Sequence, residues 1–143
     1  MRAILDRVVF VRALINPHSG SGRLLFGDLV ERYTIVLSPA IIEEILDVIF
    51  RPALRQRFPQ MASPPHVQAI LQILEDAEVV EPVMRLSVCR DPSDNKFLEC
   101  AIEAGAEYVV TEDRDLLDIR AFRGVSLITI VEFIALLEAT RLR

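Results

Sequence analysis

Short apolar runs alternate with segments of helical periodicity along this chain of 143 residues. Apolar runs bounded by polar or turn residues are typical of buried strands, whereas apolar positions that repeat every three or four residues indicate amphipathic helices. The predicted strands are 3–5, 33–37, 78–83, 108–110 and 125–128. The predicted helices are 23–31, 40–50, 65–77, 91–104 and 129–137, with a short helix between the prolines of 52–65 and a helical turn at 116–117. Segment 8–11 either extends the first strand or begins a helix that runs to residue 15.

Strands and helices alternate through the chain, and no two predicted strands are joined by a turn of hairpin length. This alternation predicts an α/β fold in which helices cover both faces of a parallel sheet, giving three layers. Ser38-Pro39 and Asp91-Pro92 predict two helix starts, because each places a capping residue directly before a proline. Residues 1–143 contain no linker and no internal repeat, so we expect a single domain.

Composition fits a well-filled interior: apolar residues make up 52% of the chain, and the mean hydropathy is +0.35. No apolar run approaches the roughly 20 residues that a membrane-spanning helix needs, and the first residues lack a secretory signal. Cys89 and Cys100 form neither a close metal-binding pair nor a disulfide framework, so we expect a cytoplasmic location. The net charge of −5 differs from the basic footprint of nucleic-acid-binding proteins. Carboxylates held around divalent cations would account for part of this negative charge.

Four acidic residues fall where an α/β fold would bring them to one edge of the sheet. Asp6 ends the first predicted strand, and Asp113 follows strand 108–110. Asp94 shares the inward face of its predicted helix, and Glu44 borders the buried stripe of its own helix. The carboxyl ends of parallel strands and the starts of the following helices face one crevice. Carboxylates gathered there repel one another unless a cation lies among them, and hard oxygen ligands suit Mg²⁺ or Mn²⁺.

Each acid also has an ordinary structural alternative. Asp6 can pair with Arg7 or cap a helix, because an acid at a strand end must be solvated or paired. Asp94 can interact with a helix dipole, an effect typically worth ~0.3–1 kcal/mol. Glu44 can simply be exposed, as many acids at the margin of an apolar stripe are. The case for a metal site therefore depends on the joint placement of these residues.

The remaining acids divide between caps and ligands. Asp91 precedes a proline and is best placed as a helix cap. Asp113 is the favoured ligand after the fourth strand, while Asp115 is either a further ligand or a cap of the turn at 116–117. Two metal ions ~3.5–4 Å apart could bind the attacking water and the leaving oxygen of a phosphodiester. Such chemistry needs no histidine, cysteine or lysine nucleophile.

The sequence motifs that contain these acids resemble those of a PIN domain, the fold of a large group of metal-dependent ribonucleases. Within that group they look most like VapC-like toxins, the toxin components of toxin–antitoxin pairs. The matching motifs are Ile4-Leu5-Asp6, Leu37-Ser38-Pro39 with Glu43-Glu44-Ile45, the segment from Cys89 to Glu99, and the segment from Tyr108 to Leu117. The resemblance implies a five-stranded parallel sheet, an RNA substrate, a Mg²⁺ or Mn²⁺ cofactor, an antitoxin partner and a homodimer. It also implies that the metal-binding and catalytic positions are taken by Asp6, Glu44, Asp94 and Asp113.

The motif around Asp6 departs from the family pattern. PIN domains commonly read Leu-Asp-Thr-Asn-Val or Leu-Asp-Thr-Ser-Val there, whereas this chain has Leu5-Asp6-Arg7-Val8-Val9. Val8 donates no hydrogen bond from its side chain, and the loss of such support can cost 10–100-fold in metal affinity or activity. Arg7 can grip a phosphate, or it can pair with Asp6 and compete with the metal.

We therefore predict a metal-dependent endoribonuclease of PIN type that acts as a toxin. Asp6, Asp94 and Asp113 hold metal in this hypothesis, Glu44 holds metal or orients water, and Asp115 is a possible further ligand. Arg7 and Lys96 are the candidates for phosphate binding.

Three alternatives stay open. The first is a catalytically weakened PIN domain that binds RNA or protein, which the Arg7-Val8 pair favours. The second is a phosphoacceptor receiver domain, which also gathers carboxylates around magnesium. That chemistry requires a lysine after a late strand, whereas the only lysine here is Lys96, within a predicted helix. The third is a structural α/β domain whose acids cap helices.

Overall fold

Six strands form one twisted sheet in the computed structural model, which describes residues 1–141. The strands are β1 (Arg2–Leu5), β2 (Thr34–Leu37), β3 (Glu78–Val79), β4 (Tyr108–Val110), β5 (Ala121–Phe122) and β6 (Val125–Ile128). Their order is β3-β2-β1-β4-β6-β5. Every neighbouring pair is parallel except β5 and β6, which are antiparallel.

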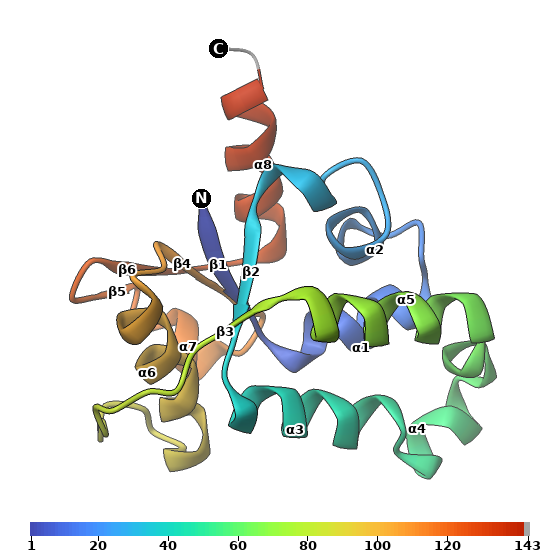
Figure 1. Ribbon diagram of the computed structural model, residues 1–143, viewed down its shortest axis with the longest axis horizontal. Helices are drawn as coiled ribbons and strands as arrows, with labels where there is room; N and C mark the ends of the chain where they lie inside the picture. Colours follow the sequence, from blue (N-terminus) through green and yellow to red (C-terminus); the bar gives the residue numbers. More distant parts are fainter. Residues whose placement is uncertain (142–143) are drawn as a thin grey trace.

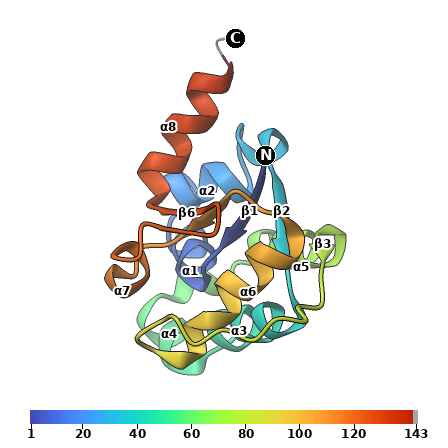
Figure 2. The same cartoon turned by 90° about the vertical axis from the view of Figure 1, so that its left-hand side faces the viewer.

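Helices cover both faces of this sheet, as Figures 1 and 2 show. The helix α6 packs on one face, where it contacts β1, β2, β4 and β6, while α1, α2 and α8 form a contiguous group on the other face. The α-helices are α1 (Arg7–Ile15), α2 (Gly20–Leu25), α3 (Pro39–Ile49), α4 (Pro52–Arg57), α5 (Pro64–Asp76), α6 (Asn95–Ala104), α7 (Arg114–Leu117) and α8 (Ile130–Arg141). Short 3-10 helices are η1 (Val30–Arg32), η2 (Pro59–Ala62) and η3 (Pro92–Asp94).

The predicted three-layer α/β class is confirmed, but the sheet has six strands and is mixed rather than five-stranded and parallel. The additional strand β5 forms a hairpin with β6, contrary to the expectation that hairpins are absent. Its two-residue turn consists of Arg123 and Gly124, which both have positive φ (49° and 84°). Turns with positive φ at both central residues usually have the sequence Asn-Gly or Asp-Gly. An arginine in that conformation gives no such signal.

Three other segments differ from the sequence pattern or resolve it. Segment 8–11 belongs to α1, which begins directly after Asp6. The predicted helix 23–31 is divided into α2 and η1. The predicted strand 78–83 retains only Glu78–Val79, and the chain beyond it has no regular secondary structure up to η3.

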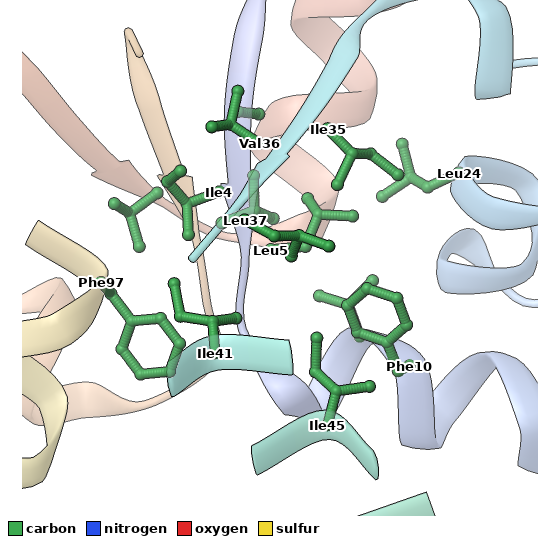
Figure 3. Close-up of a cluster of buried hydrophobic side chains, with 14 of the residues drawn as sticks. Ile4, Leu5, Phe10, Leu24, Ile35, Val36, Leu37, Ile41, Ile45 and Phe97 are labelled. Atoms are coloured by element: carbon green, nitrogen blue, oxygen red, sulfur yellow. The ribbon is translucent and has the colours of Figure 1, made fainter. Parts of the chain in front are cut away.

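One part of the core lies between the carboxyl end of the sheet and the helices α1 and α3 (Figure 3). Figure 3 shows Phe10 of α1 with Ile41 and Ile45 of α3 gathered below the ends of β1 and β2. All three side chains are fully buried, as is Leu5 at the end of β1. Burying a side chain of this size contributes ~1.5–3 kcal/mol. This packing fixes α1 and α3 beside the strand ends, where their polar residues meet.

An extended strap, residues 80–89, runs along α6 towards the acidic residues. Its backbone N–H groups donate to side chains on one stripe of that helix, spaced four residues apart. These bonds, of 2.8–3.0 Å, join Val83 to Glu103, Leu86 to Glu99, and both Val88 and Cys89 to Asn95. The Asn95 amide also donates to the carbonyl of Pro92 at 3.1 Å. The strap is thus anchored at the residue that follows Asp94.

The last helix, α8, is amphipathic in its contacts. Ile130, Phe133 and Leu137 are buried in the core, whereas Val131 is 76% exposed. Only one face of this helix is therefore buried in the core. Within residues 1–141, no helix combines the length and apolar character needed to cross a membrane.

Replacing Gly22 by alanine tests how closely α2 packs. A Cβ at Gly22 would stand 1.8 Å from the carbonyl oxygen of Pro17, a backbone atom that cannot rotate away. We expect Gly22→Ala to lower the free energy of unfolding by about 3 kcal/mol or more. The control Gly105→Ala meets no atom within 4 Å and has only the cost of its positive φ (63°), about 1 kcal/mol. Urea denaturation of both variants measures the difference, and equal losses would contradict this account of the packing.

Candidate active site

The acidic residues meet at the point where the strand order changes direction. From β1 the chain moves outward through β2 to β3 and then returns to β4 on the other side of β1. In open α/β sheets, ligands bind beyond the carboxyl ends of the strands at such a switch point. The two central strands end together, because Leu5 is in register with Val110 and the N–H of Asp6 donates to the Val110 carbonyl at 3.0 Å. Asp6 therefore lies at the centre of the sheet edge.

Asp6 is a buried acid in which one carboxylate oxygen accepts a hydrogen bond and the other does not, within the part of the chain that the structure describes. Its side chain is nearly inaccessible (3% exposed), and the hydroxyl of Thr111 donates to Oδ2 at 2.8 Å. Oδ1 is buried and has no hydrogen-bond partner among residues 1–141. Burial raises the pKa of Asp6, and the Thr111 hydrogen bond and the charge of Arg7 only partly oppose that shift. A buried carboxylate oxygen without a partner is costly unless a cation approaches it.

Thr111 is a site residue that the sequence reasoning did not single out. Its hydroxyl donates to Asp6 and accepts the N–H of Asp113 at 3.0 Å, so it links the ends of β1 and β4. The available signal was a hydroxyl residue placed between a buried strand and an acid. That signal is weak because threonine is common in strands.

Asp94 is brought towards Asp6 and Asp113 by η3 and the start of α6. Asp94 is only 3% exposed, which is unusual for an acidic residue. Burial, and then the charges of Asp113 and Asp91, raise the pKa of Asp94 to about 6. Asp94 and Asp113 are thus close enough for their charges to interact.

Asp113 and Asp115 have different surroundings. Asp113 caps α7 by accepting the N–H of Asp115 at 2.9 Å, and it lines the same cavity as Asp6. Asp115 instead forms an ion pair with Arg90 at 2.9 Å, outside that cavity. The possible further ligand, Asp115, thus has Arg90 as its partner in this structure.

Glu44 enters the site from α3 and is held by two cations. Arg7 Nη1 lies 3.1 Å from Glu44 Oε1, and Lys96 Nζ lies 3.0 Å from the same oxygen. Arg7 Nη1 is also 3.7 Å from Asp6 Oδ1. Oε2 of Glu44 is buried and lacks a hydrogen-bond partner among residues 1–141. The two candidate phosphate-binding residues are thus part of the acidic cluster itself.

Asp91 is confirmed as a cap. Its Oδ1 accepts both the N–H and the hydroxyl of Ser93, at 3.0 and 2.9 Å. These hydrogen bonds lower the pKa of Asp91, whose side chain is exposed. Its role is therefore local, in contrast to that of Asp94 three residues later.

A cavity of about 390 Å³ opens beside Asp6 and Asp113. One wall is apolar and consists of Val8, Val11, Val48 and Leu54. Charged side chains complete its lining, namely Arg7, Arg12 and Glu112. The site thus combines an acidic centre with an apolar surface large enough for part of an organic ligand.

The donor set suits a divalent cation. It consists of carboxylate oxygens, the ligands that Mg²⁺ and Mn²⁺ prefer. Two of them, Asp6 Oδ1 and Glu44 Oε2, are buried and have no hydrogen-bond partner within residues 1–141. In the arrangement that these residues adopt, no three acidic, histidine or cysteine side chains converge on one point. Binding one ion through three of the carboxylates would therefore require them to move closer together.

The fold and this acidic edge define a PIN domain, and the chain belongs to that family: the family model for the PIN domain matches residues 2–115. Members of the family are generally nucleases that use divalent metals. The chain is 33% identical over 124 residues to the uncharacterized protein MJ1680 of Methanocaldococcus jannaschii, covering 84% of this chain and 76% of that protein. The resemblance to PIN domains is confirmed.

Two solved structures have a similar fold. The crystal structure of PAE2754 from Pyrobaculum aerophilum has a TM-score of 0.59 and 18% identity, covering 97% of this chain and 90% of that one. The crystal structure of VapBC2 from Rickettsia felis, bound to a DNA fragment from its promoter, has a TM-score of 0.56 and 16% identity. That match covers 90% of this chain and 98% of the other.

The raised pKa of Asp94 predicts a pH-dependent stability in the absence of metal. The folded protein retains a proton on Asp94 up to about pH 6, whereas the unfolded chain loses it near its ordinary value of 3.8. Between these values the folded state binds more protons, so the free energy of unfolding falls as the pH rises. Asp94→Asn removes this contribution to the pH dependence.

Urea denaturation in EDTA between pH 4 and pH 7 measures this effect. The stability of Asp94→Asn relative to the unaltered protein should increase from pH 4 to pH 6 and then level off. A relative stability that stays constant or decreases over this interval would contradict the assignment of a raised pKa to Asp94.

Proposed function

We propose that this protein is a metal-dependent endoribonuclease of PIN type and the toxin of a toxin–antitoxin pair. The observation that carries the proposal is the buried cluster at the strand switch point. There Asp6 has an unpartnered oxygen, and the pKa of Asp94 is raised by burial and by Asp113. Such clusters of mutually repelling carboxylates are typical of functional sites.

In this proposal Asp6, Asp94 and Asp113 would hold Mg²⁺ or Mn²⁺, and Glu44 would hold metal or orient water. The bound ion would lower the pKa of a water molecule and offset charge on the leaving oxygen. Thr111 fixes the orientation of the Asp6 carboxylate through its 2.8 Å hydrogen bond. The attacking water would lose a proton as its oxygen bonds to phosphorus, and the leaving oxygen would take up a proton as its own bond to phosphorus breaks.

Arg7 and Lys96 would bind the substrate phosphate. Both cations lie beside Glu44, and the Arg7 side chain is 39% exposed, so it can reach a phosphate that enters the adjacent cavity. The apolar wall of that cavity offers a surface to a base next to the cleaved bond. RNA is the proposed substrate because it presents both groups together.

The partners are proposed from the fold. VapBC2, whose crystal structure is similar in fold, is bound to promoter DNA. An antitoxin partner and a homodimer for this chain extend that likeness, and the exposed Val131 on α8 gives an apolar surface for such contacts. A cytoplasmic location stays a prediction from the sequence.

Two adjacent aspartates provide a matched test of the mechanism. We expect Asp94→Asn to reduce Mn²⁺-dependent cleavage of RNA by about 100-fold or more, because it removes a ligand charge from the cluster. Asp91→Asn is the control, since asparagine also caps helices and Asp91 is exposed. A gel assay with a fluorescent RNA measures both rates. Undiminished cleavage by Asp94→Asn would refute the proposed mechanism.

A second candidate function is RNA binding with weakened cleavage. The specific observation in its favour is Arg7, which forms an ion pair with Glu44 and lies 3.7 Å from the unpartnered oxygen of Asp6. Val8 lines the cavity at the position where the family commonly has a hydrogen-bonding residue. Both departures weaken support for a metal without removing the acids.

The double variant Arg7→Thr with Val8→Asn distinguishes this candidate from an efficient nuclease. If cleavage is weakened, the unaltered protein binds RNA but cleaves it slowly, and the double variant gains about 10–100-fold in rate. Fluorescence anisotropy measures binding, and the gel assay measures cleavage. A double variant that cleaves no faster would exclude the weakened-enzyme alternative.

A further inference from the structure

We propose that Arg7 is the internal counter-ion of the metal-free site, and that it must leave Asp6 and Glu44 before a divalent cation binds. This inference rests on the metal site proposed above and adds a residue that sets its affinity. The family commonly has a small polar residue at this place, so Arg7 departs from that pattern.

The position of Arg7 follows from the fold. It is the first residue of α1 and follows Asp6 at the end of the central strand β1, and α1 packs against α3. Its Nη1 is 3.1 Å from Glu44 Oε1 and 3.7 Å from Asp6 Oδ1. One guanidinium nitrogen therefore lies between acids that come from two different elements.

The electrostatics of Arg7 agree with this geometry. Burial disfavours its charged form, yet nearby carboxylates raise the pKa of Arg7 above its ordinary value. Those carboxylates belong to Asp6, Glu44 and Asp94. The guanidinium thus balances the charge of the same cluster that would hold the metal.

Arg7 and a metal ion compete for one atom in particular. Oδ2 of Asp6 is engaged by Thr111, so Oδ1 is the oxygen that remains for a cation, and it is the one facing Arg7. A divalent ion coordinated to Oδ1 would stand next to the guanidinium charge. Like charges about 4 Å apart repel even in a partly solvated environment. The two cations therefore exclude each other.

Lys96 can still balance the charge of Glu44 when Arg7 is replaced by a metal ion. Its Nζ lies 3.0 Å from the same Oε1 that accepts Arg7. When Arg7 leaves, Glu44 retains a cation, whereas Asp6 loses its only charged neighbour of opposite sign within 4 Å among residues 1–141. The Arg7 side chain is 39% exposed, so its route towards solvent is open. Departure of Arg7 prepares Asp6 for the metal.

Calorimetric titration with MnCl₂ tests this proposal. We expect Arg7→Gln to bind Mn²⁺ about tenfold more tightly than the unaltered protein, within the usual range for coupled binding. Arg12→Gln is the matched control, because it removes the same charge from the same helix and borders the same cavity. Arg12 forms no ion pair within residues 1–141, so its variant should differ by less than about twofold from the unaltered protein. Asp94→Asn should abolish binding.

Stability gives a second readout, which a purely structural role of Arg7 would not produce. Without metal, Arg7→Gln should unfold at a lower urea concentration, because the carboxylates lose their counter-ion. With saturating Mn²⁺ this deficit should close or reverse, because the ion replaces the lost charge. A structural arginine would show the same deficit with and without Mn²⁺.

The outcomes separate this inference from the proposed function. Arg7→Gln that binds Mn²⁺ no more tightly than Arg12→Gln overturns the counter-ion role. If Asp94→Asn still abolishes binding in that case, the metal site stands. If neither the unaltered protein nor Arg7→Gln binds Mn²⁺, the counter-ion role and the proposed metal-dependent function both fall.

Discussion

The burial of a carboxylate at the end of a central strand is the constraint on which this site depends. Asp6 follows the buried residues 3–5 of β1 and is itself almost inaccessible, so its charge must be balanced by groups within the fold. Thr111 binds one of its oxygens and Arg7 lies near the other. Thr111 directly follows β4 and Arg7 begins α1, so neutralising Asp6 joins the two central strands to this helix. The polar edge is thus as firmly determined as the apolar core beneath it.

Topology gathers the rest of the cluster around that residue. The strand order β3-β2-β1-β4-β6-β5 places the switch point between β1 and β4, so that Asp6 and Asp113 lie side by side although they are far apart in sequence. The strap 80–89 leads along α6 to Asp94. Its end is fixed because the backbone N–H groups of Val88 and Cys89 donate to the side chain of Asn95, the residue after Asp94. Burial of Ile41 and Ile45 sets α3 at the same edge and so presents Glu44. Four elements from separate parts of the chain therefore meet at one charge cluster.

Local chemistry explains what could be predicted from the sequence and what could not. The adjacent Pro92 predicts that Asp91 is a cap, and its partner Ser93 lies within the same turn. Parallel pairing of the strands places the acids at their ends together. Asp115 was ambiguous because its partner, Arg90, is 25 residues distant, and sequence gives no register between them. The hairpin was missed because Arg123 adopts a positive φ without an Asn-Gly signal. Predictions failed where a residue's state depends on contacts distant in sequence.

Three kinds of positive charge can neutralise this cluster, and they are alternatives to one another. A proton can occupy Asp94 below about pH 6, the Arg7 guanidinium balances Asp6 and Glu44, and a divalent cation would balance several carboxylates at once. A built-in arginine has the advantage that the protein folds around its acids without needing metal or low pH. The same charge opposes the metal, so stability of the metal-free fold and affinity for the ion are gained at each other's expense. Arg7 thus shifts this chain towards a stable metal-free state.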